Sequence, residues 1–151
     1  LIEKACSFND YDCGHEFSLE GGITIKTGQL NHPNGACGYR IEFADKVIAI
    51  CTDTEHFEDR IDENVVTLAK NADIMVYDSA YTNEEYQNFK GWGHSTWQEA
   101  LKVAEAANVK QTLLFHHDPS HNDEKMDQIA KEVSSLRDGV RPAIEGEVIT
   151  I

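Results

Sequence analysis

Apolar and polar residues alternate in the first third of the chain and recur at helical spacing further on. The alternation in "ITIKTGQL", residues 23–30, predicts a strand. The stretches "ACGYRIEF" and "KVIAICTD" on either side of Ala44 and Asp45 predict two more strands, joined as a hairpin by a tight turn at these two residues. Residues 1–22 show no clear period and are expected to form an irregular lead-in.

Helical spacing then alternates three times with short apolar runs. Apolar residues in 60–72 recur at helical intervals and precede the predicted strand "DIMVYDS". A second helix is expected to begin at Ser95 or Thr96 and to lead into "KQTLLFHHD". A third is expected to begin at Asn122 or Asp123 and to end near Gly139, before a hairpin-like "PAIEGEVITI". The pattern predicts an α/β fold, a mixed β-sheet with flanking helices over residues 23–151.

Length and charge narrow the class of protein. A chain of 151 residues with 40% hydrophobic content predicts one domain. The net charge of -14 offers no attraction to extended nucleic acid or to an anionic membrane. The sequence shows neither an apolar run long enough to cross a membrane nor a signal peptide, and its four cysteines form no C-x-x-C pair. A cytoplasmic protein is expected, with reduced cysteines and with Cys37 and Cys51 acting as small apolar residues.

Residues that can bind metals follow the predicted strands. His32 follows "ITIKTGQL", Asp53 follows "VIAICT", Asp78 follows "IMVY" and His116 follows "TLLF". Ligand sites of open α/β sheets form beyond the carboxyl ends of the strands, where loops converge on a rigid support. Two imidazoles and two carboxylates at one edge of the sheet could bind Zn²⁺, Mn²⁺ or iron directly.

Each of these residues also has an ordinary structural explanation. His32 in "NHPNG" could be a turn residue, Asp53 could end a strand, and Asp78 could cap the next turn. His94 in "GWGHST" could be an exposed loop residue, although the glycines at 91 and 93 would let it approach a neighbouring site closely. His116 is harder to dismiss, because a buried imidazole needs hydrogen-bonding partners. Its neighbours are expected to support the site or to face solvent; these are His117, Asp118 and His121.

Five segments, in this order, resemble the second half of the metallo-β-lactamase superfamily fold. They are "LNHPNGACGYRIE", "VIAICTDTEH", "ADIMVYDSAYTNEEY", "GWGHSTWQEALKVAEAANV" and "LLFHHDP". The resemblance covers residues 23–151 and points to the phosphodiesterase branch, which includes ribonuclease Z and cyclic nucleotide phosphodiesterase-like hydrolases. It implies one half of the four-layer αββα sandwich of that superfamily.

The resemblance also implies roles for four residues. His32 and His116 would be metal ligands, and Asp53 would be the carboxylate that bridges two divalent ions, zinc or manganese. His94 in "GHST" would assist cleavage by contacting the phosphate or by protonating the leaving oxygen, while a metal-bound hydroxide attacks phosphorus. The substrate is expected to be a small phosphodiester such as a cyclic nucleotide, because of the acidic composition.

One departure from the superfamily pattern is that no H-x-H occurs in the chain, although the motif H-x-H-x-D-H supplies most of the ligands. We therefore expect that motif upstream of Leu1 and regard the chain as the C-terminal half of its parent. Alone it is expected to bind metal partially or not at all and to be inactive. A half-fold would expose apolar strand residues and form a homo-oligomer. The residues expected at that interface include Ile48, Ile50, Met75 and Leu114.

Two other functions fit the same residues. The missing motif is compatible with a non-catalytic assembly or regulatory domain that uses the half-fold for oligomerisation. An iron redox enzyme of the same fold is less favoured, because "GHST" suits phosphodiester chemistry and nothing in the chain indicates a flavin partner.

Overall fold

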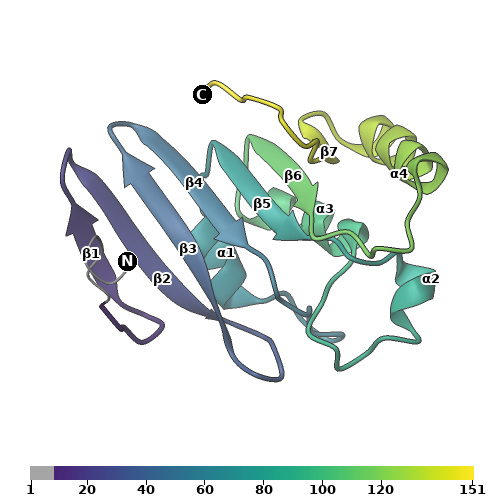
Figure 1. The fold of residues 1–151 in the computed structure, drawn as a ribbon, viewed down its shortest axis with the longest axis horizontal. Helices are drawn as coiled ribbons and strands as arrows, with labels where there is room; N and C mark the ends of the chain where they lie inside the picture. The colour runs from purple at the N-terminus through teal and green to yellow at the C-terminus, as the bar shows by residue number, and fades with distance from the viewer. Residues whose placement is uncertain (1–8) are drawn as a thin grey trace, which may run out of the picture.

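The computed structural model describes residues 9–151 and contains a seven-stranded mixed sheet (Figure 1). The strands lie in chain order: β1 (Glu16–Leu19), β2 (Ile23–Leu30), β3 (Ala36–Phe43), β4 (Lys46–Cys51), β5 (Ile74–Asp78), β6 (Gln111–Phe115) and β7 (Val140–Pro142). Neighbours from β1 to β4 pair antiparallel, and neighbours from β4 to β7 pair parallel. The predicted mixed α/β sheet is therefore confirmed.

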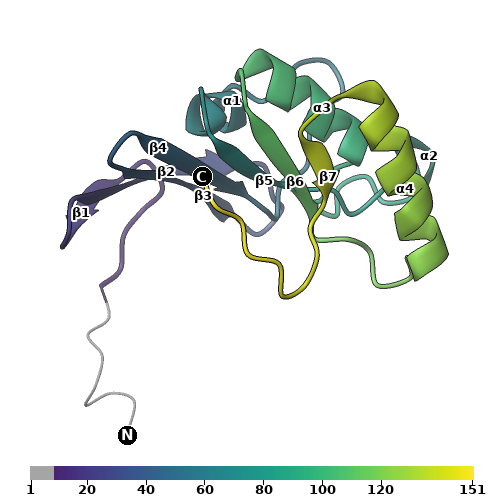
Figure 2. The same ribbon diagram turned by 90° about the horizontal axis from the view of Figure 1, so that it is seen from above.

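Helices connect the parallel strands and cover one face of the sheet. They are α1 (Glu63–Ala69), α2 (Asn83–Tyr86), α3 (Trp97–Ala106) and α4 (Asp123–Leu136). Helices α1 and α3 lie against this face, and α4 packs beside β7 (Figure 2). Beneath them, Met75, Tyr77 and Leu114 form the centre of the hydrophobic core. None of these four helices is long and apolar enough to cross a membrane.

Side-chain caps determine where the helices begin. Thr96 and Asn122 cap α3 and α4, at positions that the sequence predicted. Helix α1 is shorter than the predicted 60–72, because the Asp62 carboxylate caps it by accepting from the backbone amides of Asn64 and Val65. At the other end of α1, the Arg40 guanidinium donates to the backbone carbonyls of Leu68 and Lys70. In a longer helix these carbonyls would accept hydrogen bonds from backbone amides of the next turn.

Both ends of the chain differ from the sequence-based expectation. The lead-in 1–22 was expected to be irregular. Residues 9–15 form no strand, but residues 16–19 form β1, which pairs with the edge of β2. Residues 1–8 lie outside the described part. The predicted hairpin at 142–151 is wrong. After α4 the chain pairs parallel with the open edge of β6 as β7, and this pairing ends at Pro142. The segment beyond β7 forms no strand.

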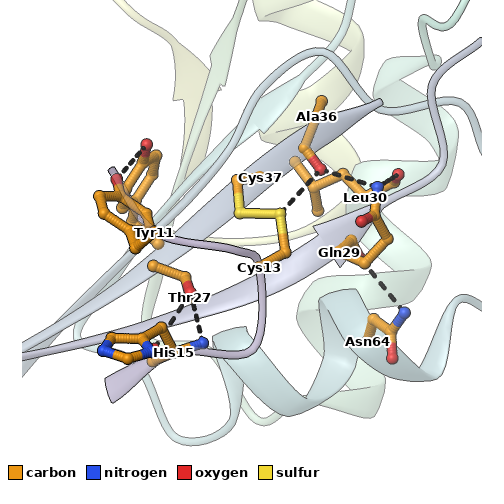
Figure 3. The surroundings of a disulfide bond; sticks show 10 residues. Tyr11, Cys13, His15, Thr27, Gln29, Leu30, Ala36, Cys37 and Asn64 are labelled. Atoms are coloured by element: carbon orange, nitrogen blue, oxygen red, sulfur yellow. Dashed lines mark hydrogen bonds between the residues drawn. A yellow bond between two sulfur atoms is a disulfide. The ribbon is translucent and has the colours of Figure 1, made fainter. Parts of the chain in front are cut away.

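Two of the cysteines form a disulfide, so the prediction that they are reduced is wrong for this pair. Cys13 and Cys37 are joined with their Cα atoms 5.7 Å apart (Figure 3). The Tyr11 hydroxyl lies 2.9 Å from that of Tyr39 beside the disulfide. The lead-in is thereby tied to β3. Cys51 is a buried free thiol, as expected, and burial raises its pKa to about 12.

The second face of the sheet carries a set of apolar residues that are only partly buried. We call this set the open face; it comprises Ile25, Ile41, Ile48, Ile50, Val76 and Leu113. No helix of residues 9–151 packs against it (Figure 2). The expectation that Met75 and Leu114 would be exposed here is wrong. Both point to the helical side and are 0% exposed, whereas Ile48 and Ile50 do lie on the open face.

Candidate active site

Four strand ends meet at one edge of the sheet and carry the predicted site residues. His32 follows β2, Asp53 follows β4, Asp78 ends β5 and His116 follows β6. These four strands run in the same direction, since β2 and β4 are both antiparallel to β3 and the others are parallel to β4. His94 joins them from the loop before α3. The fold thus brings the predicted residues to one place.

Potential ligand atoms form two groups that share His94. Those of His32, Asp53 and His94 lie within 4.8 Å of one another, and so do those of Asp78, His94 and His116. The groups touch directly, because His116 Nε2 lies 3.9 Å from Asp53 Oδ1. Imidazole nitrogens and carboxylate oxygens are the donors that zinc and manganese accept, so this donor set fits a divalent metal ion.

Asp53 and His116 both have left-handed backbone conformations. Their φ angles are 59° and 62°, in a region that residues other than glycine rarely adopt. Such a conformation costs on the order of 1–3 kcal/mol and is found where the surroundings enforce it, often at functional sites. At Asp53 part of that enforcement is visible, because its amide donates to Asp78 Oδ2 at 3.0 Å.

Asp78 is the direct partner of His94. His94 Nδ1 lies 3.0 Å from Asp78 Oδ2, and this hydrogen bond raises the pKa of the imidazole. The carboxylate is 0% exposed and also accepts from the backbone amides of Ala80 and Ser95. The sequence marked Asp78 as a possible metal ligand or turn cap, but it did not predict that Asp78 is the hydrogen-bonding partner of His94.

Sequence reasoning missed Glu55 entirely. Its carboxylate accepts from the Tyr86 hydroxyl at 2.6 Å and from the amides of Gly91 and Gly93 at 2.7 and 2.9 Å. Burial raises the pKa of Glu55, but the hydrogen bonds from Gly91, Tyr86 and Gly93 outweigh burial and lower it overall. Its place two residues after Asp53 was the only hint in the sequence.

Gly93 brings the His94 loop against His32. A Cβ atom at position 93 would lie 2.1 Å from His32 Cδ2, and the φ angle of Gly93 is 92°. Both the space and the backbone conformation therefore require glycine. The close approach that the sequence suggested is made to the ring of His32.

Two surface pockets of about 410 Å³ flank the site. One has exposed aromatic rings at its rim, with Trp92 62% and Phe115 47% exposed. It is lined by Ala80, Tyr81, Trp92, His94, Phe115, His116, His117, Asp118 and Pro119. The other is lined by Asn31, His32, Pro33, Glu55, His56, Phe57, Glu58, Tyr86, Lys90 and Gly91. A larger pocket of about 630 Å³ lies against β2, β3 and α1, and it contains none of the predicted site residues.

The remaining histidines of "LLFHHDPSHND" lie outside the two ligand groups. Both ring nitrogens of His117 are buried without a hydrogen-bonding partner among the described residues, and burial lowers its pKa. His121 Nε2 lies 3.2 Å from the Glu85 carboxylate, and its side chain is nearly buried. His121 is thus a contact between the loop before α4 and α2.

Both the sequence and the fold of this chain are similar to those of known proteins. Residues 2–117 match the family model described as "Beta-lactamase superfamily domain". Ribonuclease Z of Limosilactobacillus reuteri is 31% identical over 106 residues, which cover 70% of this chain and 33% of that protein. The chain thus spans about a third of that relative's length.

Solved structures share the fold at low sequence identity. The metallo-β-lactamase fold protein YhfI from Bacillus subtilis superposes with a TM-score of 0.74 at 20% identity, over 91% of this chain and 52% of that one. Human tRNase Z, short form, gives a TM-score of 0.65 at 21% identity, over 89% and 44% of the two chains. The family match, the relatives and the fold agree that this chain belongs to the metallo-β-lactamase superfamily, in its phosphodiesterase branch.

Proposed function

We propose that the full-length protein containing this chain is a metal-dependent hydrolase of RNA phosphodiesters. The observation that carries the proposal is the pair of His94 and Asp78 beside Asp53 and His116, at the edge where the strand ends meet. The chain spans 33% of its Limosilactobacillus relative, so we propose that further residues of the full-length protein supply the remaining metal ligands.

Each residue of the site has a distinct role in this proposal. His32, Asp53 and His116 hold zinc or manganese, which when bound supplies positive charge to the phosphate and lowers the pKa of water. His94, when protonated, donates a proton to the leaving oxygen, since the hydrogen bond that its Nδ1 makes to the Asp78 carboxylate raises the pKa of His94 and orients the ring. Asp78 itself stays buried and does not contact substrate.

RNA is proposed in place of the small phosphodiester expected from the composition. The relatives found by sequence are named ribonuclease Z, which gives a cyclic nucleotide no support. The net charge of -14 provides little attraction to a phosphate backbone. Unpaired bases can instead stack on exposed aromatic rings, and Trp92 and Phe115 offer such rings beside His94.

Replacing His94 tests the proposal. In the full-length protein, His94→Ala should lower kcat for cleavage of single-stranded RNA by about 10²–10⁴-fold, because a general acid is lost. Bound zinc and manganese should be unchanged by elemental analysis. His15→Ala is the control, because His15 is an exposed histidine near β1, away from the site. Equal loss of metal and activity would make His94 a ligand, and hydrolysis of cyclic nucleotides but not RNA would overturn the choice of substrate.

A second candidate function is a non-catalytic assembly domain. The observation in its favour is the open face, whose apolar residues are only partly buried. This function predicts that the full-length protein binds no metal, cleaves no phosphodiester and still forms a homo-oligomer. The same metal analysis and RNA assay separate the two functions.

A further inference from the structure

We propose that Glu55 is a positioning residue that holds His94 in place through the backbone of its loop. The catalytic consequence rests on the proposed function, whereas the positioning itself is a property of the described chain. Glu55 belongs to neither of the two ligand groups, and it touches His94 only through the chain that leads to it.

The carboxylate of Glu55 accepts hydrogen bonds from helix α2 and from the loop that carries His94. Oε1 accepts from the Tyr86 hydroxyl of α2 and from the Gly91 amide, and Oε2 accepts from the Gly93 amide. Gly91 and Gly93 have φ angles of 82° and 92°, so the loop takes a path that few other residues allow. Glu55 is only 8% exposed, so these hydrogen bonds compete little with water.

The backbone of the same residue is tied to the segment that carries His32. The Glu55 amide donates to the Asn31 carbonyl at 2.7 Å, and Asn31 Nδ2 donates to the Glu55 carbonyl at 2.9 Å. Asn31 directly precedes His32, and Asp53 lies two residues before Glu55. One residue therefore joins the three segments that bear His32, Asp53 and His94.

A carboxylate suits this position better than any other side chain. Three donors converge on its two oxygens, and an ionised carboxylate is an acceptor at every position. A glutamine would have nearly the same shape, but its NH₂ group would face one of these donors. The far side of the loop has a separate tie, because His56 Nδ1 lies 3.0 Å from Ser95 Oγ. Glu55→Gln should therefore loosen the loop locally without unfolding it.

Loosening the loop should act on turnover more than on binding. A proton donor works only within hydrogen-bonding distance of the leaving oxygen, and a misplacement of about 1 Å can cost on the order of 10²-fold in rate. Because Glu55 is not a predicted ligand, its loss should leave bound metal unchanged. A residue with a merely structural role would instead reduce the amount of folded protein, and with it metal and activity together.

The experiment compares Glu55→Gln with Glu58→Gln in the full-length protein. Glu58 lies on the same segment but is exposed and reaches the loop only through an ion pair with Lys90. For Glu55→Gln we expect amide exchange at Gly91 and Gly93 to accelerate at least ~10-fold and kcat to fall by about 10- to 100-fold. KM should stay within ~3-fold and metal content should be unchanged. Glu58→Gln should match the wild type in all four measurements.

A milder variant guards against misfolding of Glu55→Gln. Tyr86→Phe removes one donor and leaves both glycine contacts, so its kcat should fall by only about 3- to 10-fold. Unchanged amide exchange at Gly91 and Gly93 in Glu55→Gln would overturn the proposal, and so would faster exchange with an unchanged kcat. If the wild type cleaves no phosphodiester, the proposed function fails. The positioning is then decided by exchange and by the ¹⁵N shifts of the His94 ring, which must change in Glu55→Gln and not in Glu58→Gln.

Discussion

The two faces of the sheet differ although the same strands build both. On the helical side Met75 and Leu114 are 0% exposed, whereas Ile48, Ile50 and Leu113 on the open face keep part of their surface in solvent. Side chains alternate along a strand, so one residue step separates the two environments. The covering helices belong to the crossovers of the parallel half, which all return over one side. The alternation of apolar residues places apolar side chains on both faces of the sheet. How much each face contributes to the stability of the fold depends on what packs against it.

The sharpest test compares two adjacent leucines of β6. Leu114→Ala should lower the free energy of unfolding by about 3–4 kcal/mol, because it leaves a cavity beneath the helices. Leu113→Ala on the open face should cost about 1 kcal/mol, since less surface is removed from contact. Urea denaturation of both variants measures the difference. Equal losses would mean that something covers the open face as completely as the helices cover the other.

Breaking the disulfide should loosen the region where the lead-in meets β3. Cys13 and Cys37 are 24 residues apart, and opening a loop of this size costs about 3–4 kcal/mol in the chain-entropy account. Cys13→Ser should therefore lower the denaturation midpoint in the absence of reductant. Mass spectrometry with and without reduction establishes the pairing. If reductant leaves the wild-type midpoint unchanged, the disulfide is absent in solution.

On the helical side, the Glu85 carboxylate links α2 to α4, and we expect its contribution to the free energy of unfolding to depend on pH. Burial raises the pKa of Glu85, but hydrogen bonds from Thr82 and Lys125 and the charge of His121 lower it from 4.5 to about 2. A lowered folded-state pKa stabilises the protein above pH 4.5, and that stabilisation disappears as the pH falls towards 2. Glu85→Gln should therefore cost about 1–2 kcal/mol at pH 7, allowing for partial solvent screening.

The same comparison at low pH completes this test. Near pH 2 the free energies of unfolding of the wild type and Glu85→Gln should differ by only about 0.5 kcal/mol, because Glu85 is then about half protonated in the folded protein and almost fully protonated in the unfolded chain. Glu84→Gln is the matched control, since Glu84 is an exposed carboxylate of the same helix. If the free energies of unfolding of Glu85→Gln and the wild type differ by the same amount from pH 7 to pH 2, the ionised form of Glu85 does not provide the stabilisation.

The smallest expected effect on folding concerns the open face itself. Ile48→Lys should change the free energy of unfolding by less than about 1 kcal/mol, because the long side chain can reach solvent there. It should abolish association of this chain, which we expect to form a homo-oligomer at micromolar concentration through the open face. Light scattering measures this, with Glu105→Lys on the exposed side of α3 as control. A monomeric wild type would refute the assembly.

The sequence by itself determined the elements that depend on near neighbours. Alternation located β2, β3 and β4, and the short spacing between the last two located the tight turn at Ala44 and Asp45. Side-chain caps three residues from the amides they bind marked the starts of α3 and α4. The order of strands and crossovers also placed His32, Asp53 and His116 at one edge, since carboxyl ends of codirectional strands meet there.

Only the tertiary structure decided which distant groups meet. Glu55 binds Tyr86, Gly91 and Gly93 across separations of 31, 36 and 38 residues, and Cys13 pairs with Cys37 across 24. No local periodicity encodes such contacts, because hydrogen bonds and disulfides depend on atoms being brought within a few ångströms by the whole fold. The same holds for Asp78, whose carboxylate becomes the partner of His94 only once β5 is buried beneath α3.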